Sequence, residues 1–251
     1  MWTFEAAPLG WFQQAYDWQP TDKWLESARL ASLRLGNFSE DGNHSYFCSA
    51  SFVSDHGLIM TNHHCARDSI VKVQGESDWL KDGFYAGSYA GELKVPGLIV
   101  SQMVGQKDVT EEVNEKGKDQ VLAAAMKAQP ELSHQVIALY QGGSYQLYTF
   151  KIFDDLRLVC APHGQSAHFG GDPDNFCYPR WGLDFTFVRA YEDGEPVDSS
   201  KHCFNWRTEG ANEGEAVFVT GNPGRTGRLK TLAQCEFMRD YYYPNLVTRY
   251  E

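Results

Sequence analysis

The sequence predicts a mainly β fold: a mostly antiparallel β barrel with helical insertions. Three observations support this fold class. Short apolar segments with strand-like alternation recur along the chain, turn residues separate them, and helical periodicity is confined to a few stretches. The 251 residues include 23 Gly and 10 Pro, which indicates many turns. With 42% hydrophobic and 22% charged residues, the composition is that of a globular protein, not of a disordered chain.

The first elements are a helix and a hairpin. Residues 24–35 place mostly apolar side chains at helical spacing, and Gly36 ends the pattern. A short strand is predicted at 49–54 and a second at 58–61, with a turn at Gly57 between them. The two strands are therefore expected to pair as an antiparallel hairpin.

The middle of the chain predicts a helix over residues 108–128. Asp108 can cap its start, residues 121–126 have high helix propensity, and Pro130 stops it. Because this helix lies between strand-like segments, we interpret it as a helical insertion in the barrel.

The second half of the chain is again strand-like. Residues 135–140 and 145–150 flank Gly142 and Gly143, which is a good hairpin signal, and further strands are predicted at 156–160 and 184–191. From Leu229 to the last residue the pattern becomes helical once more.

Charge and hydropathy exclude two classes of partner. The chain has 22 Lys+Arg against 33 Asp+Glu, a net charge of −11, which argues against general binding to a phosphate backbone. No apolar run approaches the ~18–20 residues of a membrane-spanning helix, and Met1 opens no charged-then-apolar leader. We therefore expect no nucleic acid and no membrane span, and we expect any secretory signal peptide to lie outside this chain.

The six cysteines are candidates for disulfide bonds. Their spacings include 65 − 48 = 17 and 177 − 160 = 17, which suit local loops that a disulfide stabilises by about 3 kcal/mol. No C-x-x-C pair is present, so a zinc ribbon is not indicated. The even number favours an oxidising compartment, and the alternative is six buried thiols in a cytosolic protein. The candidates are Cys48, Cys65, Cys160, Cys177, Cys203 and Cys235.

Residues 61–65, Thr-Asn-His-His-Cys, are the most informative segment and follow the first hairpin directly. A histidine at a strand end, followed by a cysteine that can bridge back to the preceding strand, is how chymotrypsin-like barrels hold their general base. His64 is therefore the candidate base, with His63 as its neighbour on the other face. Two alternatives stay open: a metal site of His63, His64 and Cys65, and a purely structural histidine pair in a turn.

A general base needs an orienting carboxylate, and three aspartates are candidates. Asp184 opens a strand with period-2 alternation, so its side chain is expected at a strand end near the barrel rim. Asp172 and Asp174 flank a proline in a turn, where aspartates usually cap their own backbone. Asp184 is therefore the candidate acid. Asn175 and Phe176, in the same loop, can present an amide and an aromatic face to a substrate.

Together these motifs resemble the bacterial dipeptidyl-peptidase 7/11 family. The resemblance is carried by residues 61–65, 169–176 (Phe-Gly-Gly-Asp-Pro-Asp-Asn-Phe), 178–180 (Tyr-Pro-Arg) and 221–226 (Gly-Asn-Pro-Gly-Arg-Thr), with an opening Met-Trp-Thr-Phe at 1–4. Members of that family are serine peptidases with a chymotrypsin-like double β-barrel and an inserted helical domain. The resemblance therefore implies this fold, and it covers essentially the whole chain.

The resemblance also assigns roles to residues. The family's general base corresponds to His64 and its triad acid to Asp184, in agreement with the choice made from the residues. The stretch that holds the free N-terminal amine of the substrate corresponds to Asn175 and Phe176. Many family members have Trp where this chain has Phe176, which removes an indole nitrogen but leaves a main-chain contact unchanged.

The family's nucleophile stands in a Gly-Asn-Ser-Gly-Ser-Pro stretch, which this sequence does not contain. The nearest match, residues 221–224, has Pro223 at the position of the serine. Ser166 and Ser199 lack the glycine-rich frame of an oxyanion hole. We therefore expect the chain to be the N-terminal portion of a longer peptidase, and to be inactive alone. Residues 1–228 are expected to form the first barrel, and 229–251 to begin the helical domain.

The resulting functional hypothesis is a serine-type dipeptidyl aminopeptidase that removes dipeptides from free peptide N-termini by acyl transfer. Its expected partners are peptide substrates with free N-termini, and the resemblance implies a homodimer for the full-length protein. No cofactor and no metal are expected, and the expected location is periplasmic or extracellular. The alternatives are a truncated pseudo-enzyme or a non-catalytic module that binds peptide N-termini.

Overall fold

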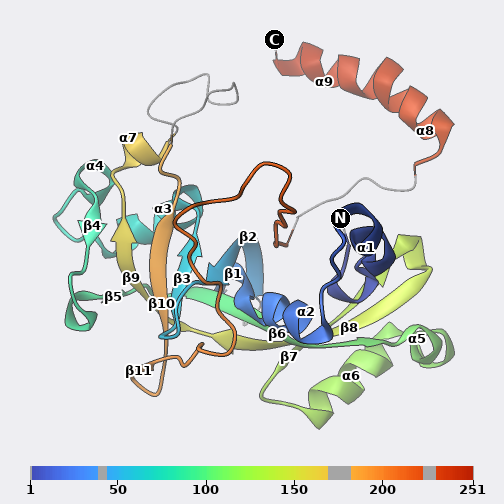
Figure 1. Ribbon diagram of the computed structural model, residues 1–251, viewed down its shortest axis with the longest axis horizontal. Coiled ribbons are helices and arrows are strands. Elements are labelled where there is room, and N and C mark those ends of the chain that lie inside the picture. Colours follow the sequence, from blue (N-terminus) through green and yellow to red (C-terminus); the bar gives the residue numbers. More distant parts are fainter. Residues whose placement is uncertain (1, 39–43, 169–181, 223–229, 251) are drawn as a thin grey trace.

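One antiparallel β-sheet dominates the fold. The computed structural model describes residues 2–38, 44–168, 182–222 and 230–250, and Figure 1 shows its strands through the centre of the molecule with helices around them. Within the described residues the strand order is β4-β9-β10-β3-β2-β1-β6-β8-β7, with β11 beside β10 and β5 beside β9. The strands are β1 (Ser32–Phe38), β2 (His44–Phe52), β3 (Leu58–Thr61), β4 (Phe84–Tyr85), β5 (Leu93–Lys94), β6 (Leu98–Asp108), β7 (Ser133–Leu139), β8 (Ser144–Phe153), β9 (Asp155–Ala161), β10 (Thr186–Glu192) and β11 (Glu195–Pro196).

Helices precede the sheet, interrupt it and follow it. The α-helices are α1 (Leu9–Tyr16), α2 (Asp22–Ala31), α3 (His63–Val73), α4 (Trp79–Asp82), α5 (Thr110–Lys116), α6 (Lys118–Ala128), α7 (Gly164–Ala167), α8 (Leu232–Phe237) and α9 (Tyr243–Tyr250). Single turns of 3₁₀-helix occur at η1 (Phe4–Ala6), η2 (Tyr89–Gly91) and η3 (Tyr140–Gly142), and a π-helical turn, η5 (Met238–Tyr242), joins α8 to α9.

The sheet curls around one main hydrophobic core. Strands β9, β10, β3, β2, β1 and β6 follow one another by hydrogen bonding, and β6 also lies against β9. The curled strands enclose fully buried side chains such as Leu35, Ile59, Val100, Leu158 and Val188. Alternation along each strand sends every second side chain inward, which is why short strands with period-2 patterns build this core.

The prediction of a mainly β, mostly antiparallel fold with helical insertions is confirmed. Every strand pair described runs antiparallel. The sheet remains open, because β4 and β7 at the two ends of its strand order pair with different neighbours and not with each other in the described residues. The fold is consistent with a chymotrypsin-like barrel that hydrogen bonds do not close. The division into 1–228 and 229–251 stays a prediction.

The first predicted helix is wrong at its C-terminal end. Helix α2 begins after Thr21, whose side chain accepts the backbone N–H of Trp24, and it ends at Ala31. The apolar residues Leu33 and Leu35 lie in strand β1, fully buried and paired with β2 and β6. Two leucines spaced by two residues lie on the same face of a strand and on opposite faces of a helix, and both pack inward between two neighbouring strands.

The predicted helix at 108–128 is two helices. Gly117 separates α5 from α6 with a φ of +86°, a conformation that side chains other than glycine rarely adopt. The helices lie next to β7 and β8, where Val113 and Val121 bury their side chains with Val136. The helical insertion is therefore confirmed as an insertion, with a break that its glycine explains.

An aromatic cluster ties the N-terminal helices to the segment that follows the sheet. Phe218 packs against Phe12, Trp18 and Trp24, with ring centroids 5.3–5.7 Å apart. Four residues later, the backbone N–H of Asn222 donates to Ser49 Oγ at 2.8 Å. These contacts carry the segment after the sheet back across the start of the chain and up to strand β2.

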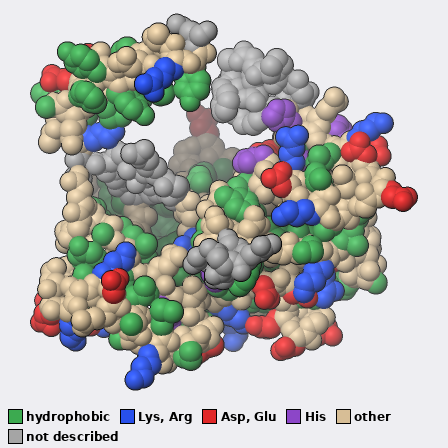
Figure 2. Space-filling view, turned by 180° about the vertical axis from the view of Figure 1, so that it is seen from behind, with side chains coloured by type: hydrophobic (Ala, Val, Ile, Leu, Met, Phe, Trp, Pro, Cys, Tyr) green, Lys and Arg blue, Asp and Glu red, His purple; other side chains and the backbone are tan. Residues whose placement is uncertain are grey.

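The last helices present apolar side chains to solvent. Figure 2 shows hydrophobic side chains on a helical segment that stands apart from the rest of the molecule, and Figure 1 identifies it as α8 and α9. Leu232, Phe237, Tyr241 and Val247 are among its exposed residues. Among the helices in the described ranges, none is long and apolar enough to cross a membrane.

Candidate active site

The pairing of β3 with β10 brings the two predicted catalytic residues together. Thr61, at the end of β3, is the register partner of Thr186, at the start of β10. Because the strands are antiparallel, the residues just after Thr61 and those just before Thr186 leave the sheet at the same edge. His64 and Asp184 lie in these two segments, 120 residues apart in sequence.

The carboxylate of Asp184 contacts His64 twice. One oxygen, Oδ2, lies 2.7 Å from Nδ1 of the His64 ring, and the other, Oδ1, accepts the backbone N–H of His64 at 3.0 Å. The backbone N–H of His63 also donates to Asp184. Asp184 thus supplies the N-terminal cap of helix α3, whose own N-cap residue, Asn62, makes no side-chain cap bond.

Asn62 holds Asp184 from a second direction. Its side-chain amide Nδ2 donates to the carbonyl oxygen of Asp184 at 3.1 Å and lies 3.3 Å from Oδ2. No role for Asn62 is predicted from the sequence. The available signal was its position, since it is the residue that joins β3 to the histidines.

The pKa of Asp184 lies below its ordinary value. Burial alone raises this pKa, but the hydrogen bonds from the backbone and ring of His64 and the attraction of the imidazole outweigh it. An ionised Asp184 accepts a hydrogen bond from Nδ1–H of His64. That assigns the proton to Nδ1 and leaves a lone pair on Nε2, which is the form a general base requires.

The side chains of His64 and Asp184 differ in solvent exposure, as a general base and its orienting acid require. The His64 side chain is 64% exposed, whereas that of Asp184 is 19% exposed. An accessible imidazole can reach a reacting group, and a shielded carboxylate interacts with it more strongly because less water screens the charge.

His63 is in a different environment from His64. It is only 4% exposed, and it donates a hydrogen bond to the carbonyl of Pro162. Burial lowers its pKa, with smaller contributions from neighbouring charges. His63 Nε2 has no partner in the described structure. The two adjacent histidines therefore separate into a buried neutral residue and an exposed one beside a carboxylate.

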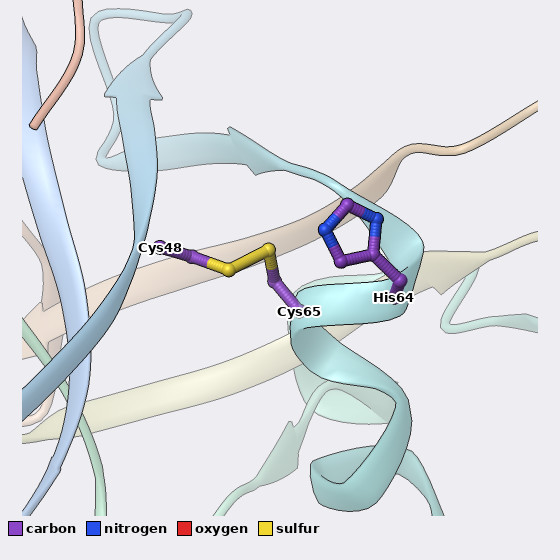
Figure 3. A group of neighbouring side chains, drawn as sticks. All are labelled: Cys48, His64 and Cys65. Carbon is purple, nitrogen blue, oxygen red and sulfur yellow. A yellow bond between two sulfur atoms is a disulfide. The ribbon is translucent and has the colours of Figure 1, made fainter. Parts of the chain in front are cut away.

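A disulfide fixes helix α3 to strand β2. Cys48 and Cys65 are bonded, with Cα atoms 6.2 Å apart, and Figure 3 shows the His64 ring beside the bridge. Among the other candidates, Cys160, Cys203 and Cys235 are free thiols, and Cys177 lies outside the described residues. The bridge that brackets the candidate base is thus the one formed within the described chain.

His163 and Ser166 form a histidine–hydroxyl pair that lacks the features of a catalytic dyad. Ser166 Oγ lies 2.7 Å from Nε2 of His163, while His163 Nδ1 accepts the backbone N–H of Ser166 at 3.2 Å. Because Nδ1 is the acceptor, the neutral ring carries its proton on Nε2 and donates it to the hydroxyl. His163 cannot then remove the proton of Ser166, and the pair caps α7.

Not all of the remaining predicted site residues belong to the part of the chain that the structure describes. Asn175 and Phe176, with Asp172 and Asp174, lie outside the described residues. Of the motif at 221–226, Gly221 and Asn222 are described, and the side-chain amide of Asn222 donates to the carbonyl of Leu33 at 3.3 Å.

Comparison with known proteins identifies relatives over most of the chain. The dipeptidyl-peptidase 7 of Phocaeicola vulgatus is 31% identical over 218 residues, which are 74% of this chain and 30% of the relative. The Asp/Glu-specific dipeptidyl-peptidase of Capnocytophaga gingivalis is 37% identical over 205 residues, 71% of this chain and 29% of the relative. This chain therefore spans about 30% of the length of these relatives.

A solved structure has the same fold. Porphyromonas endodontalis DPP11 in complex with the dipeptide Arg-Glu matches with a TM-score of 0.63 at 28% identity, covering 74% of this chain and 31% of that chain. The resemblance to the dipeptidyl-peptidase 7/11 family is thereby confirmed. The family model of peptidase S46 matches residues 1–251, and the chain belongs to the peptidase S46 family.

Proposed function

We propose that this chain carries the general base and the orienting acid of a serine-type dipeptidyl aminopeptidase. His64 is the base and Asp184 the acid. The observation that carries the proposal is the contact between His64 Nδ1 and Asp184 Oδ2 at 2.7 Å, with Nε2 left free on an exposed ring. Relatives described as dipeptidyl-peptidases support the reaction class.

In the proposed reaction, His64 Nε2 takes the proton of a serine hydroxyl as that oxygen attacks the second peptide bond of the substrate. Asp184 stabilises the imidazolium that forms, and it keeps the ring oriented. The imidazolium then gives its proton to the leaving amine, and an acyl-enzyme remains. A water molecule, deprotonated by the same nitrogen, releases the dipeptide.

We propose that the nucleophilic serine belongs to a part of the relatives that this chain does not cover. The sequence has no Gly-Asn-Ser-Gly-Ser-Pro stretch, and the matched region is about 30% of each relative. On this proposal the chain alone releases no dipeptides. The homodimer implied by the family resemblance stays a prediction.

The proposed substrates are peptides with a free N-terminus. DPP11 of P. endodontalis has been crystallised with the dipeptide Arg-Glu, which has the size of the expected product. Asn175 and Phe176 are the residues proposed to receive the substrate amine. The disulfide next to the base supports a periplasmic or extracellular location, since such bonds persist in oxidising compartments.

The test uses this chain joined to the part of a relative that it does not cover, which carries the proposed serine; this protein is called the completed protein below. Release of dipeptides from a peptide with a free N-terminus is compared with release from its acetylated form. We expect release from the free peptide, and loss of that release in His64→Ala and in Asp184→Ala. Full activity in both variants would show that the pair is not catalytic.

A further inference from the structure

The residues around the candidate general base also offer the ligand atoms of a metal site. Cys48, His64 and Cys65 each offer one metal-ligand atom, and these three atoms lie within 4.8 Å of one another. Figure 3 shows the His64 ring with one nitrogen on the side that faces the two sulfur atoms. No other group of three such residues meets this criterion in the ranges that the structure describes.

The orientation of His64 is that of a metal ligand with a supporting carboxylate. Nδ1 is bonded to Asp184, so Nε2 is the nitrogen that is free to bind a cation. A metal-bound histidine usually donates its other ring N–H to a carboxylate, which fixes the ring and makes the ligating nitrogen more basic. Asp184 is placed to do this for His64.

The ligand set suits a thiophilic divalent cation. Two thiolates and one imidazole are typical zinc ligands, with Zn–S near 2.3 Å and Zn–N near 2.0–2.1 Å, and three protein ligands leave the fourth position to water. In tetrahedral geometry such ligand atoms stand roughly 3.3–3.8 Å apart, as these distances require. The three atoms here are already within 4.8 Å, so small side-chain rotations bring them into range once the sulfurs separate.

While the disulfide is intact, its two sulfurs are bonded to each other and cannot act as thiolates. We propose that reduction of the Cys48–Cys65 disulfide converts this cluster into a zinc site, in which both sulfurs and His64 Nε2 bind one Zn²⁺. A dithiol donor supplies the two electrons and two protons that make the two thiols, and is itself oxidised to a disulfide. Binding of Zn²⁺ then releases both thiol protons to solvent.

The consequence for activity rests on the proposed function. The metal would occupy the lone pair of Nε2 that is proposed to accept the serine proton, so the reduced, zinc-bound protein would be inactive. Zinc binding by the reduced chain does not depend on the proposed catalytic role, so the two proposals can be tested separately.

The alternative metal site predicted from the sequence consists of His63, His64 and Cys65. His63 is not part of this cluster, because its side chain is buried and hydrogen-bonded to the backbone of Pro162. Cys48, from the preceding strand, takes its place.

The experiment measures zinc retained by this chain after gel filtration, with and without a phosphine reductant that does not bind the metal. We expect about one Zn²⁺ per chain in the reduced form and none above background in the oxidised form. Reduced His64→Ala should bind zinc at least tenfold more weakly, because it keeps both thiols and loses the imidazole. His64 is exposed, so this substitution leaves the fold intact.

Cys160→Ser is the matched control, since it removes a free thiol outside the cluster and should leave zinc retention unchanged. Circular dichroism of the reduced chain provides the second measurement. Three outcomes overturn the proposal. The reduced protein loses its native spectrum, it retains no zinc, or the reduced His64→Ala variant binds zinc as tightly as the reduced native protein. In the completed protein, dipeptide release inhibited by zinc after reduction but not before supports the inactive state, and inhibition in both forms refutes it.

Discussion

The carboxylate of Asp184 accepts both the ring Nδ1–H and the backbone N–H of His64, at 2.7 Å and 3.0 Å. One side chain therefore caps helix α3 and orients the imidazole of His64, the second residue of that helix. Since the cap and the ring bond share one acceptor, the start of the helix and the direction of the ring are fixed together. This coupling makes the geometry of the site depend on the pairing of β3 with β10, which delivers Asp184 to that position.

The first prediction concerns this carboxylate. Asp184→Asn keeps the size of the side chain, removes its charge and replaces one of the two acceptor oxygens with an NH2 donor. The variant therefore no longer stabilises the protonated ring, and it lacks an acceptor for either the ring or the backbone N–H of His64. In the completed protein we expect kcat to fall by about 10³–10⁴-fold. Steady-state kinetics on a peptide with a free N-terminus measures this. Asp198→Asn is the control, because Asp198 bonds to Ser200 and does not contact His64. A loss of less than tenfold in Asp184→Asn would contradict the assignment.

The second prediction concerns Asn62. Asn62→Ala removes both amide hydrogen bonds to Asp184, and a hydrogen bond to a charged group contributes about 1.5–3 kcal/mol. Because Asp184 is then held by fewer donors, we expect kcat to fall roughly tenfold, with each 1.36 kcal/mol corresponding to a factor of ten. KM should stay within about twofold of the native value, since the contact is to the acid and not to substrate. Asn245→Ala, on α9, serves as the control, and an effect confined to KM would argue against a positioning role.

Much of this arrangement could be predicted from the sequence. The short apolar segment 58–61 after a turn predicts β3, the alternation in 184–191 predicts β10, and the Cys48 and Cys65 spacing predicts the bridge that the structure forms. His64 directly precedes Cys65, and this adjacency is a local signal for the candidate base. Each of these features is encoded within a few neighbouring residues, and such signals need no knowledge of tertiary contacts.

Features that depend on distant contacts could not be predicted in this way. Leu33 and Leu35 continue the apolar run of helix α2, and their pairing with β2 and β6 on either side shows that the helix ends before them. The long strand β6 is not predicted from the sequence. Residues 98–102 within it are all buried, so the strand lacks the period-2 alternation of buried and exposed side chains. The role of Asn62 depends on Asp184, 122 residues away.

The third prediction concerns pH and His63. The folded-state pKa of His63 is lowered by burial from an ordinary value of 6.5, against an opposing contribution from Asp184. The unfolded chain therefore binds more protons than the folded chain between the two pKa values, and folding stability falls as pH drops below about 6.5. His63→Asn keeps an N–H donor for Pro162 but does not titrate, so it should flatten this part of the curve.

Chemical denaturation of the chain between pH 8 and pH 5 measures this dependence. Asp184, whose pKa is also lowered, contributes in a separate window below its own ordinary value of 3.8. His56→Asn is the control for the same substitution at an exposed position, since the His56 side chain is 66% exposed and lies beside Asp55. An equal slope in native protein and in His63→Asn would show that His63 does not carry the effect.

The fourth prediction concerns Phe218, which joins the segment after the sheet to the N-terminal helices. Its ring packs against Phe12, Trp18 and Trp24 although it is 36% exposed. Phe218→Ala removes most of that apolar contact, and we expect the free energy of unfolding to fall by about 1–3 kcal/mol, less than for a fully buried phenylalanine. Val219→Ala, next to it and 95% exposed, should change the free energy by less than about 0.5 kcal/mol. Urea denaturation followed by tryptophan fluorescence reports on the cluster itself, since Trp18 and Trp24 belong to it. If both variants had native stability, the cluster would not anchor this segment, and Asn222 with its bond to Ser49 would have to hold it alone.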